Sequence, residues 1–316
     1  MKIAIITGSP NEIILSIINN WDVACIFQSP PRRRKSLVRK SIKIVVEYSS
    51  EILGLKRKSL RYIAKKNHCE FYHYEVDFIK KYLIDNHIDL LFVYGMSSLL
   101  PKSVWNIPKC GTINVHLSYL PDYRGPFPEF WYYLNYDLNP GVSVHYIDET
   151  EDTGDIICQE KFTLKSGSTS REYFDIAERK LGVKLANRAI GLIQNNDFQP
   201  LKQKNLKPTP RARNLSISEH KNFIQWNSWG VDRTFHFLKG VESWMNPIDP
   251  PFFHFLGFRW TYYIKSRNQK YFKSKTGLVN RKIFGGSILV CDGEIGYKLD
   301  LNLKNIIRNF INYGNK

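Results

Sequence analysis

The sequence lacks several features that would place it in other protein classes. No apolar run reaches the about 18 to 20 residues that a membrane-spanning helix needs. No CxxC pair occurs, and the five cysteines are odd in number and far apart, which argues against a disulfide framework or a zinc site. We therefore expect reduced thiols, no metal and a cytoplasmic location. Gly8 and Pro10 break the first apolar run early, so we interpret it as a buried strand and not as a signal peptide.

A dinucleotide-binding fingerprint is also missing. The turn after the first apolar run reads Thr7-Gly8-Ser9-Pro10, where a GxGxxG motif would stand. Hydride transfer with a nicotinamide or flavin cofactor therefore has no support from the sequence.

Acidic residues are few relative to basic ones, and the net charge is +17. Residues 31–66 hold thirteen Lys and Arg against only Glu47 and Glu51, so much of the excess is local. A local basic segment predicts an anionic partner, such as a substrate phosphate, a nucleic acid or an anionic lipid surface. A solvated insertion without a partner is the alternative.

The chain of 316 residues is long enough for about two domains, and 43% hydrophobic residues can form a core. Over the first 160 residues, short apolar runs alternate with helical patterns. The predicted strands are Lys2–Thr7, Trp21–Gln28, Glu70–Tyr74, Ile88–Tyr94, Gly111–Leu117, Gly141–Ile147 and Asp155–Lys161, and the predicted helices are Asn11–Asn20 and Val76–Asn86. This order is typical of a doubly wound, Rossmann-like α/β fold with a mostly parallel sheet. Its ligand site should lie beyond the carboxyl ends of the central strands.

The remainder of the chain has a different pattern. A capping box, Thr169 to Glu172, predicts a long helix that ends near Asn195. The following stretch is rich in Pro, Lys and Arg and is typical of a linker or a strap. The last hundred residues predict a helix over Trp226–Trp244, strands over Phe252–Lys265 and Lys282–Leu301, and turns at Gly285-Gly286 and Asp292-Gly293. We predict a catalytic domain at 1–200, a linker at 201–215 and a small β-rich, OB-like domain at 216–316.

Three polar residues carry the chemistry that the sequence suggests. Asn114 and His116 are two apart on a predicted strand, so their side chains leave the same face, and Asp152 follows a second strand. An amide can donate to an oxyanion, an imidazole can exchange a proton, and a carboxylate can orient the imidazole. These residues alone indicate acyl transfer or proton transfer; purely structural roles are the alternative.

The setting of the three residues resembles a known family. The segment Asn114-Val-His116-Leu-Ser118-Tyr-Leu-Pro121-Asp-Tyr-Arg124-Gly125 is similar to the signature of formyltransferases that use 10-formyltetrahydrofolate. Gly141-Val-Ser-Val-His145, followed by Glu151-Asp152-Thr153-Gly154, resembles the second signature of that family. The two segments occur in the expected order, and the resemblance covers roughly residues 1–200.

The resemblance implies a role for each candidate residue. His116 would act as general base or stabilise charge, Asn114 would hold the developing oxyanion, and Asp152 would position His116. The folate would lie against Tyr94, Gly95, Met96, Ser118, Tyr119, Leu120, Pro121, Ile147 and Asp148, largely through backbone groups. The residues expected on the acceptor side are Tyr123, Arg124 and Trp131.

The resemblance leaves two candidates for the formyl acceptor. One candidate is the amine of a nucleotide-linked amino deoxysugar, destined for a surface polysaccharide such as the O-antigen of lipopolysaccharide; the other is methionyl-tRNA. The basic segment suits tRNA. The loop after Pro121 and the segment Trp229–Gly240 depart from the tRNA enzymes, and these departures favour the sugar.

Other features have simpler interpretations. We interpret His145 as a packed core histidine and His236 as structural or at a domain contact. The aromatic run Phe127–Tyr133 is interpreted as a helix core, with stacking on a base or a sugar ring as the alternative. Asp122 and Asp148 are candidates for turn caps. The aromatic residues of the tail, Phe252, Phe253, Phe255, Phe258 and Trp260, suggest a homodimer contact or a domain interface. A reading from another class is a non-catalytic protein that binds RNA or a membrane surface through the basic segment, where Leu37, Val38, Ile42, Val45 and Val46 form an apolar stripe.

Overall fold

The computed structural model describes most of the chain: residues 1–30, 59–96, 98–203, 207–251, 254, 258–268, 276–277 and 279–300. The basic segment up to residue 58, with its apolar stripe, and Phe252, Phe253 and Phe255 lie outside the described residues. The chain forms two compact units. Unit 1 comprises Met1–Pro128, Pro140–Phe162 and Phe174–Arg213, and unit 2 comprises Glu129–Asn139, Thr163–Tyr173 and Asn214–Lys316. Whether these units are domains with the predicted bounds stays a prediction.

Unit 1 is built on a seven-stranded sheet in the order β3-β2-β1-β4-β5-β6-β7. Its strands are β1 (Ile3–Thr7), β2 (Val23–Gln28), β3 (Glu70–His73), β4 (Leu90–Tyr94), β5 (Thr112–His116), β6 (Gly141–Tyr146) and β7 (Ile156–Lys161). The first five in this order run parallel, whereas β6 and β7 are antiparallel to their neighbours. The predicted Rossmann-like sheet is therefore confirmed, and every strand predicted before residue 162 forms.

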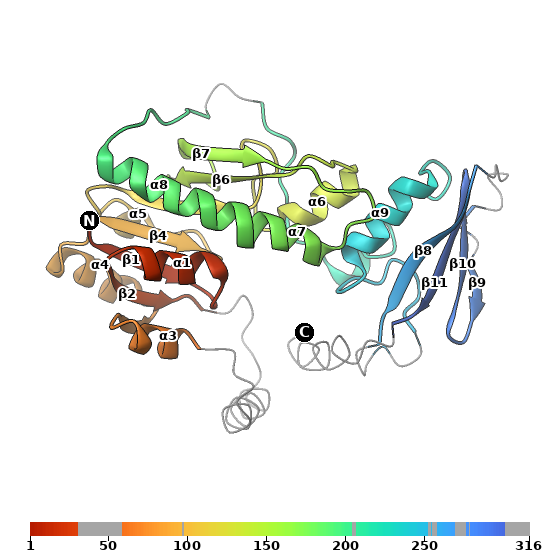
Figure 1. The fold of residues 1–316 in the computed structure, drawn as a ribbon, viewed down its shortest axis with the longest axis horizontal. Coiled ribbons are helices and arrows are strands. Elements are labelled where there is room, and N and C mark those ends of the chain that lie inside the picture. Colours follow the sequence, from red (N-terminus) through yellow and green to blue (C-terminus); the bar gives the residue numbers. More distant parts are fainter. Residues whose placement is uncertain are drawn as a thin grey trace. The chain divides into compact units, whose positions relative to one another are not determined.

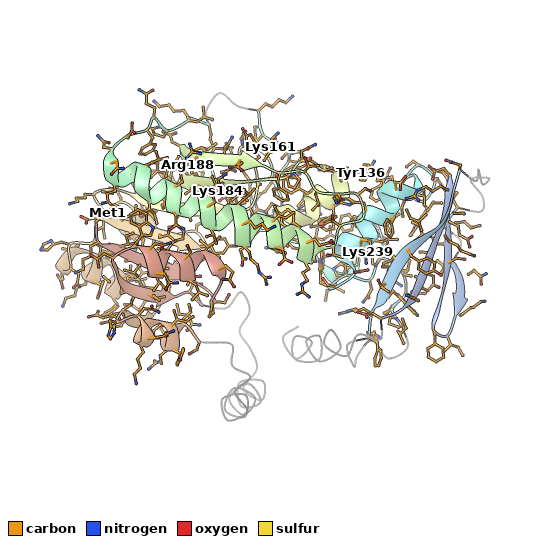
Figure 2. All side chains as sticks on the ribbon, in the orientation of Figure 1. Met1, Tyr136, Lys161, Lys184, Arg188 and Lys239 are labelled. Atoms are coloured by element: carbon orange, nitrogen blue, oxygen red, sulfur yellow. The ribbon has the colours of Figure 1, made fainter. Side chains whose placement is uncertain are left out.

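Helices cover the sheet of unit 1 (Figure 1). They are α1 (Glu12–Asn20), α3 (Leu60–Lys66), α4 (Val76–Asp85), the short α5 (Lys102–Trp105) and α8 (Val183–Asn195). The core under α4 joins Ala4, Ile6, Ile79, Leu91 and Val93, all at most 3% exposed. Along α8, Leu185, Ala186 and Ala189 are buried, while Lys184 and Arg188 face solvent (Figure 2). The helical periodicity in the sequence thus arises from one buried and one solvated face.

The long helix predicted from Thr169 to Asn195 is not uniform. It consists of α7 (Ser170–Ile176), a π-helical segment η1 (Ala177–Gly182) and α8. The capping box is present, because the Thr169 N–H donates to the Glu172 carboxylate at 2.7 Å and the Glu172 N–H donates to the Thr169 Oγ1 at 3.3 Å. At Gly182, a Cβ atom would lie 2.7 Å from the Ile13 Cδ1, so close packing on α1 requires a glycine where the helix widens.

Unit 2 combines a helical part with a separate antiparallel sheet. Most of α6 (Pro128–Asn135) and α9 (Val231–Val241) build an aromatic core, in which the Phe130 ring centroid lies 4.9 Å from Phe223 and 5.9 Å from Phe237. This core explains why Glu129–Asn139 belongs to unit 2. The run Phe130, Tyr132 and Tyr133 is at most 1% exposed, in line with its interpretation as a helix core.

The sheet of unit 2 has the order β8-β11-β10-β9, with β8 (Trp260–Arg267), β9 (Val279–Lys282), β10 (Gly285–Val290) and β11 (Gly293–Leu299). The predicted turn at Gly285-Gly286 is wrong, since both glycines lie inside β10 and the turn is at Ile283-Phe284. A Cβ atom at Gly286 would lie 2.0 Å from the Asn280 carbonyl oxygen and 2.5 Å from the Tyr297 hydroxyl. The glycine therefore allows close strand pairing and does not mark a chain reversal.

The described part of the chain contains neither a membrane-spanning helix nor a disulfide bond. None of its helices is both long enough and apolar enough to cross a membrane. All five cysteines are described and free, Cys25 and Cys158 being buried.

Candidate active site

Asn114 and His116 lie at the carboxyl end of β5, where the parallel strands of unit 1 end. Two residues apart, they leave the same face of the sheet, next to Val93 of β4 and opposite His145 and Ser143 of β6. Asn114 is partly exposed and His116 is 7% exposed. This is the edge at which a doubly wound sheet binds its ligand.

A tight turn between β6 and β7 returns Asp152 to these two residues. The Asp148 Oδ1 accepts from the Thr150 N–H at 3.2 Å and from the Thr153 hydroxyl at 2.7 Å, so Asp148 does cap this turn. Asp152 has a φ of +54°, in the left-handed region. At Gly154, a Cβ atom would lie 1.9 Å from the Tyr146 carbonyl oxygen, so only glycine fits. The backbone of this turn thus fixes where the carboxylate of Asp152 lies.

The carboxylate of Asp152 joins two imidazoles. Its Oδ2 lies 3.6 Å from the His116 Nδ1, and its Oδ1 lies 3.6 Å from the His145 Nε2. The Gly125 backbone N–H also donates to Oδ2, at 2.8 Å. Asp152 is 15% exposed at its side chain. The Asn114, His116, Asp152 trio predicted from the sequence is therefore brought together, with His145 as a fourth member.

The electrostatic balance at Asp152 favours its charged form. Burial alone would raise the pKa of this carboxyl, but the charge of His116, the hydrogen bond and charge of His145 and the Gly125 N–H together hold the pKa well below its usual range. Asp152 is therefore ionised at neutral pH and places a negative charge beside the two imidazoles.

The proton on His116 follows from its neighbours. Its Nε2 lies 2.9 Å from the Tyr123 carbonyl oxygen, which can only accept, so Nε2 carries a hydrogen. A neutral His116 would then point the lone pair of Nδ1 at the Asp152 carboxylate. A proton taken up at Nδ1 would lie beside this negative charge. Of the two roles expected from the resemblance, this arrangement suits charge stabilisation.

His145 is the residue that sequence reasoning undervalued. It is 2% exposed, as expected of a packed histidine, yet its Nε2 faces two members of the cluster, Asn114 and Asp152. Its Nδ1 lies 2.8 Å from the Tyr146 carbonyl oxygen and its Nε2 lies 3.2 Å from the Asn114 Nδ2. The sequence signal for it was its place at the end of Gly141–His145, the segment that resembles the second family signature.

Of the residues expected to contact the folate, Tyr94 has a side chain that points away from Asn114, whereas Gly95 has an open backbone. The register of β4 and β5 puts the Tyr94 side chain on the face opposite Asn114, where its hydroxyl donates to the Glu178 carboxylate at 2.9 Å. Gly95 has a φ of +69°, and a Cβ atom there would meet nothing within 4 Å. Met96, which follows Gly95, and Ile147, whose N–H donates to the Thr112 carbonyl at the start of β5, are both partly buried against the core. Tyr94 could therefore contact a ligand at this edge only through its backbone.

Most of the loop Ser118–Pro121 serves to hold its own shape. Ser118 and Leu120 are fully buried; the Ser118 hydroxyl donates to the Asp122 carbonyl at 2.6 Å, and the Leu120 N–H donates to the Ser143 hydroxyl at 3.0 Å. Pro121 follows a cis peptide bond. The ring of Tyr119 has the Lys161 ammonium 4.6 Å from its centroid. Only Tyr119 and Pro121, both partly exposed, present side chains to solvent.

The residues expected on the acceptor side are also distributed. Tyr123 is buried, with a φ of +55°, and contributes its carbonyl to His116. Arg124 is half-buried and adjoins Gly125, the backbone donor to Asp152. Trp131 belongs to unit 2, where its ring lies 5.6 Å from that of Phe130, so its place at the site stays a prediction.

The described residues contain no group of three or more His, Cys, Asp or Glu side chains able to hold a metal ion.

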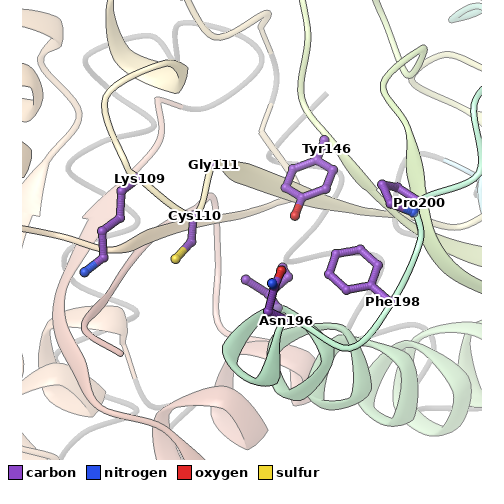
Figure 3. A pocket seen from close by; sticks show the side chains of 8 residues that line it. Lys109, Cys110, Gly111, Tyr146, Asn196, Phe198 and Pro200 are labelled. Atoms are coloured by element: carbon purple, nitrogen blue, oxygen red, sulfur yellow. The ribbon is translucent and has the colours of Figure 1, made fainter.

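A separate cavity of about 500 Å³ lies before β5, lined by Lys109, Cys110, Gly111, Tyr146, Ile193, Asn196, Phe198 and Pro200 (Figure 3). Because Lys109, Cys110 and Gly111 precede the strand that ends at His116, this cavity is at the other edge of the sheet.

Comparison with known proteins agrees with this geometry. A family model described as Formyl transferase matches residues 22–186, more than half of the chain. A methionyl-tRNA formyltransferase from Alkaliphilus oremlandii is 36% identical over 156 residues, which are 49% of each chain. The chain thus spans about half the length of the curated relatives it matches.

Two solved structures are similar over more of the chain. A 4-N formyltransferase from Francisella tularensis is 25% identical with a TM-score of 0.51, covering 78% of this chain and 89% of that one. The N-formyltransferase from Helicobacter canadensis, in complex with folinic acid and dTDP-3-aminofucose, is 18% identical with a TM-score of 0.63, covering 95% and 100%. At 18% identity, the similarity to the Helicobacter canadensis enzyme shows only a shared fold. Together with the family match, these findings show that the chain belongs to the formyl transferase family.

Proposed function

We propose that this protein transfers a formyl group from 10-formyltetrahydrofolate to an amine. The observation that carries the proposal is the cluster of Asn114, His116, His145 and Asp152, with contacts of 3.2 to 3.6 Å, at the ligand-binding edge of a formyl transferase domain. Structures of this fold that contain tetrahydrofolate, 5-formyltetrahydrofolate or folinic acid support the choice of donor.

The residues at this edge fit such a donor. The backbone at Gly95 is open, so it can pair with the polar edge of a flat heterocycle, and the neighbouring Met96 offers an apolar side chain. When bound, the folate supplies an activated formyl group. Asn114, a partly exposed residue, would donate to the formyl oxygen as negative charge develops there.

Proton and charge handling then falls to the imidazoles and Asp152. The acceptor amine forms the new C–N bond to the formyl carbon and gives up one proton, and the folate nitrogen leaves and takes one. His116, held by the Tyr123 carbonyl and by Asp152, would stabilise the developing charge. Asp152, kept ionised, would stabilise the imidazolium and hold its orientation. No covalent intermediate on the protein is required.

As acceptor we favour the amine of a nucleotide-linked amino deoxysugar, on a route to a surface polysaccharide. The 25% identical 4-N formyltransferase and the sugar N-formyltransferases of the same fold support this choice, as do the departures after Pro121. Methionyl-tRNA is the second candidate, because the curated relatives with 27 to 36% identity are methionyl-tRNA formyltransferases. The basic segment 31–66 would suit the tRNA.

Two experiments test these statements separately. Formyl transfer from 10-formyltetrahydrofolate should fall about 10²-fold or more in Asn114→Ala and in His116→Ala, because each removes a group needed at the reacting atoms. Unchanged turnover in both variants contradicts the catalytic assignment. Incubation with a panel of nucleotide amino sugars and with methionyl-tRNA then identifies the acceptor, and formylation of the tRNA alone would overturn the sugar.

The non-catalytic alternative has its own test. Removal of residues 31–58 should leave formyl transfer to a small amino sugar intact, while a protein that acts only by binding RNA or membranes would show no transfer in either form. A liposome and RNA pull-down with both forms measures the contribution of the basic segment directly.

A further inference from the structure

The Gln203 side chain links Arg124 to the turn that carries Asp152. Its Oε1 accepts from the Arg124 Nη2 at 2.7 Å and from Nε at 3.3 Å. Its Nε2 donates to the Gly154 carbonyl at 2.6 Å and to the Asp152 carbonyl at 3.2 Å. Gln203 is 2% exposed, and these four contacts use both of its donors and both acceptor positions of its oxygen. The amide therefore has one orientation, and it fixes the plane of the guanidinium.

The contacts of Arg124 leave one edge of its guanidinium unused. Nε and one N–H of Nη2 go to Gln203; the two N–H groups of Nη1 and the second of Nη2 have no acceptor among the described residues. These atoms form the fork that binds carboxylates and phosphates in a bidentate manner. The partner on the other edge is a neutral amide, so it does not neutralise the charge.

Arg211, on the segment that carries Gln203, shows what a guanidinium with a carboxylate partner looks like. Arg211 donates through Nε and Nη2 to both oxygens of the Glu151 carboxylate and is thereby neutralised. Arg124 is half-buried and holds its charge against a carboxamide instead. Keeping a partly buried guanidinium without a carboxylate partner costs free energy, which a bound anion would offset.

The location of the unused edge connects it with the candidate active site. Arg124 directly precedes Gly125, whose N–H donates to the Asp152 carboxylate, and Gln203 bonds the backbone of Asp152 itself. We infer that Arg124 binds an oxyanion of a substrate through its Nη edge, and that Gln203 is the positioning residue for this contact. The inference rests on the proposed function in naming a substrate. The oxyanion can be a phosphate of the acceptor or a carboxylate of the folate.

Further bonds from the segment of Gln203 hold the backbone on both sides of Arg124. The Thr209 Oγ1 accepts from the Tyr123 N–H at 2.6 Å, and the Ala212 N–H donates to the Arg124 carbonyl at 2.7 Å. The Phe127 N–H donates to the Ala212 carbonyl at 3.1 Å. All three bonds come from residues beyond 186, where the family match ends. The site is thus completed by a part of the chain that the family signature does not contain.

Calorimetric titration of the full-length protein tests the inference without a need for turnover. The ligands are inorganic pyrophosphate, for the acceptor, and 5-formyltetrahydrofolate, for the donor, each with wild type, Arg124→Ala, Arg124→Lys and Gln203→Leu. Loss of a bidentate charged contact should weaken binding of one ligand about 10- to 100-fold in Arg124→Ala. Arg124→Lys should recover part of the loss, and Gln203→Leu should weaken the same ligand about 10-fold, since the charge stays but its orientation is lost.

The ligand that is affected identifies the source of the oxyanion. Weaker pyrophosphate binding assigns Arg124 to the acceptor, and weaker folate binding assigns it to the donor. Arg211→Ala is the matched control and should bind both ligands as the wild type does. If Gln203→Leu does not fold, the Arg124 variants still decide the point. Binding of both ligands by Arg124→Ala as tight as in wild type overturns the inference, even if formyl transfer itself is observed.

Discussion

His145 on β6 lies directly opposite Asn114 on β5, and its Nε2 is 3.2 Å from the Asn114 amide nitrogen. The Nδ1 of His145 faces the Tyr146 carbonyl oxygen at 2.8 Å, and this leaves Nε2 directed at the Asn114 amide and, at 3.6 Å, at the Asp152 Oδ1. This contact holds the Asn114 amide against the His145 ring. His145 is thus placed to position the group that would hold the oxyanion.

Replacing His145 should therefore reduce turnover more than substrate binding. In His145→Leu the Asn114 amide and the Asp152 carboxylate each lose a buried partner, and we expect kcat to fall about 10²-fold with KM for the acceptor within about threefold. His145→Gln retains a hydrogen-bonding side chain and should recover part of kcat. Initial rates of all three proteins, after a check of folding by circular dichroism, decide the point; an unchanged kcat in His145→Leu would assign His145 to packing alone.

Two glycines in unit 1 should respond to the same substitution in opposite directions. In Gly154→Ala the new Cβ would lie 1.9 Å from the Tyr146 carbonyl oxygen, so the turn that carries Asp152 must move. We expect lower stability, by about 2 kcal/mol or more, and a loss of formyl transfer. Gly191, inside α8, has nothing nearer than the Trp21 ring at 3.8 Å, and Gly191→Ala should stabilise the helix by up to about 1 kcal/mol. Urea unfolding of both variants gives the comparison.

The sequence was most informative where a repeating pattern determines the structure. Buried runs such as Leu90–Tyr94 predict strands, and the spacing of Asn114 and His116 predicts two side chains on one face, because alternation along a strand is a local property. The predicted trio comes together for this reason. The turn predicted at Gly285-Gly286 is wrong because the need for glycine there is not a local property. It comes from Asn280 and Tyr297 on neighbouring strands.

Contacts made across large sequence separations were outside the reach of such patterns. Gln203 lies 79 residues from Arg124 and 51 from Asp152, and no local spacing connects these positions. The interpretation of His145 as a packed histidine was incomplete, because burial of a ring does not exclude polar contacts with functional residues. In this site they occur together: the ring is 2% exposed and its two nitrogens face polar atoms of the cluster and of Tyr146.

The depressed pKa of Asp152 predicts a pH dependence with a defined sign. A carboxyl whose pKa is lower in the folded than in the unfolded state stabilises the protein above its unfolded value, near 3.8, and this contribution is lost as the pH falls through the folded pKa. Asp152→Asn should therefore lower stability at pH 7, and the difference from wild type should shrink below pH 4. Thermal unfolding at several pH values measures it. Asp85→Asn, at an exposed position at the end of α4, is the control and should track the wild type throughout.

In unit 2, His236 should make stability depend on pH in a different window. The ring is fully buried, its Nδ1 accepts from the Gly167 N–H at 3.0 Å, and its Nε2 has no partner among the described residues. Burial lowers the pKa of His236 from 6.5 to about 4. Above pH 6.5 the ring is neutral in both folded and unfolded chains. Between pH 6.5 and 4 only the unfolded chain takes up the proton, so stability falls as the pH falls, by up to about 1.4 kcal/mol per pH unit.

The variant that isolates this effect is His236→Asn, whose side-chain oxygen can still accept from the Gly167 N–H but cannot take up the proton. We expect it to be less stable than wild type at pH 7, because the ring leaves a cavity beside Tyr133, whose ring centroid lies 4.7 Å away. Its stability should then decline less steeply than that of wild type between pH 6.5 and 4. His87→Asn removes an imidazole at an exposed position with a φ of +50°, which asparagine tolerates, and serves as the control. Equal slopes for wild type and His236→Asn would show that the buried imidazole takes up its proton without opening of unit 2.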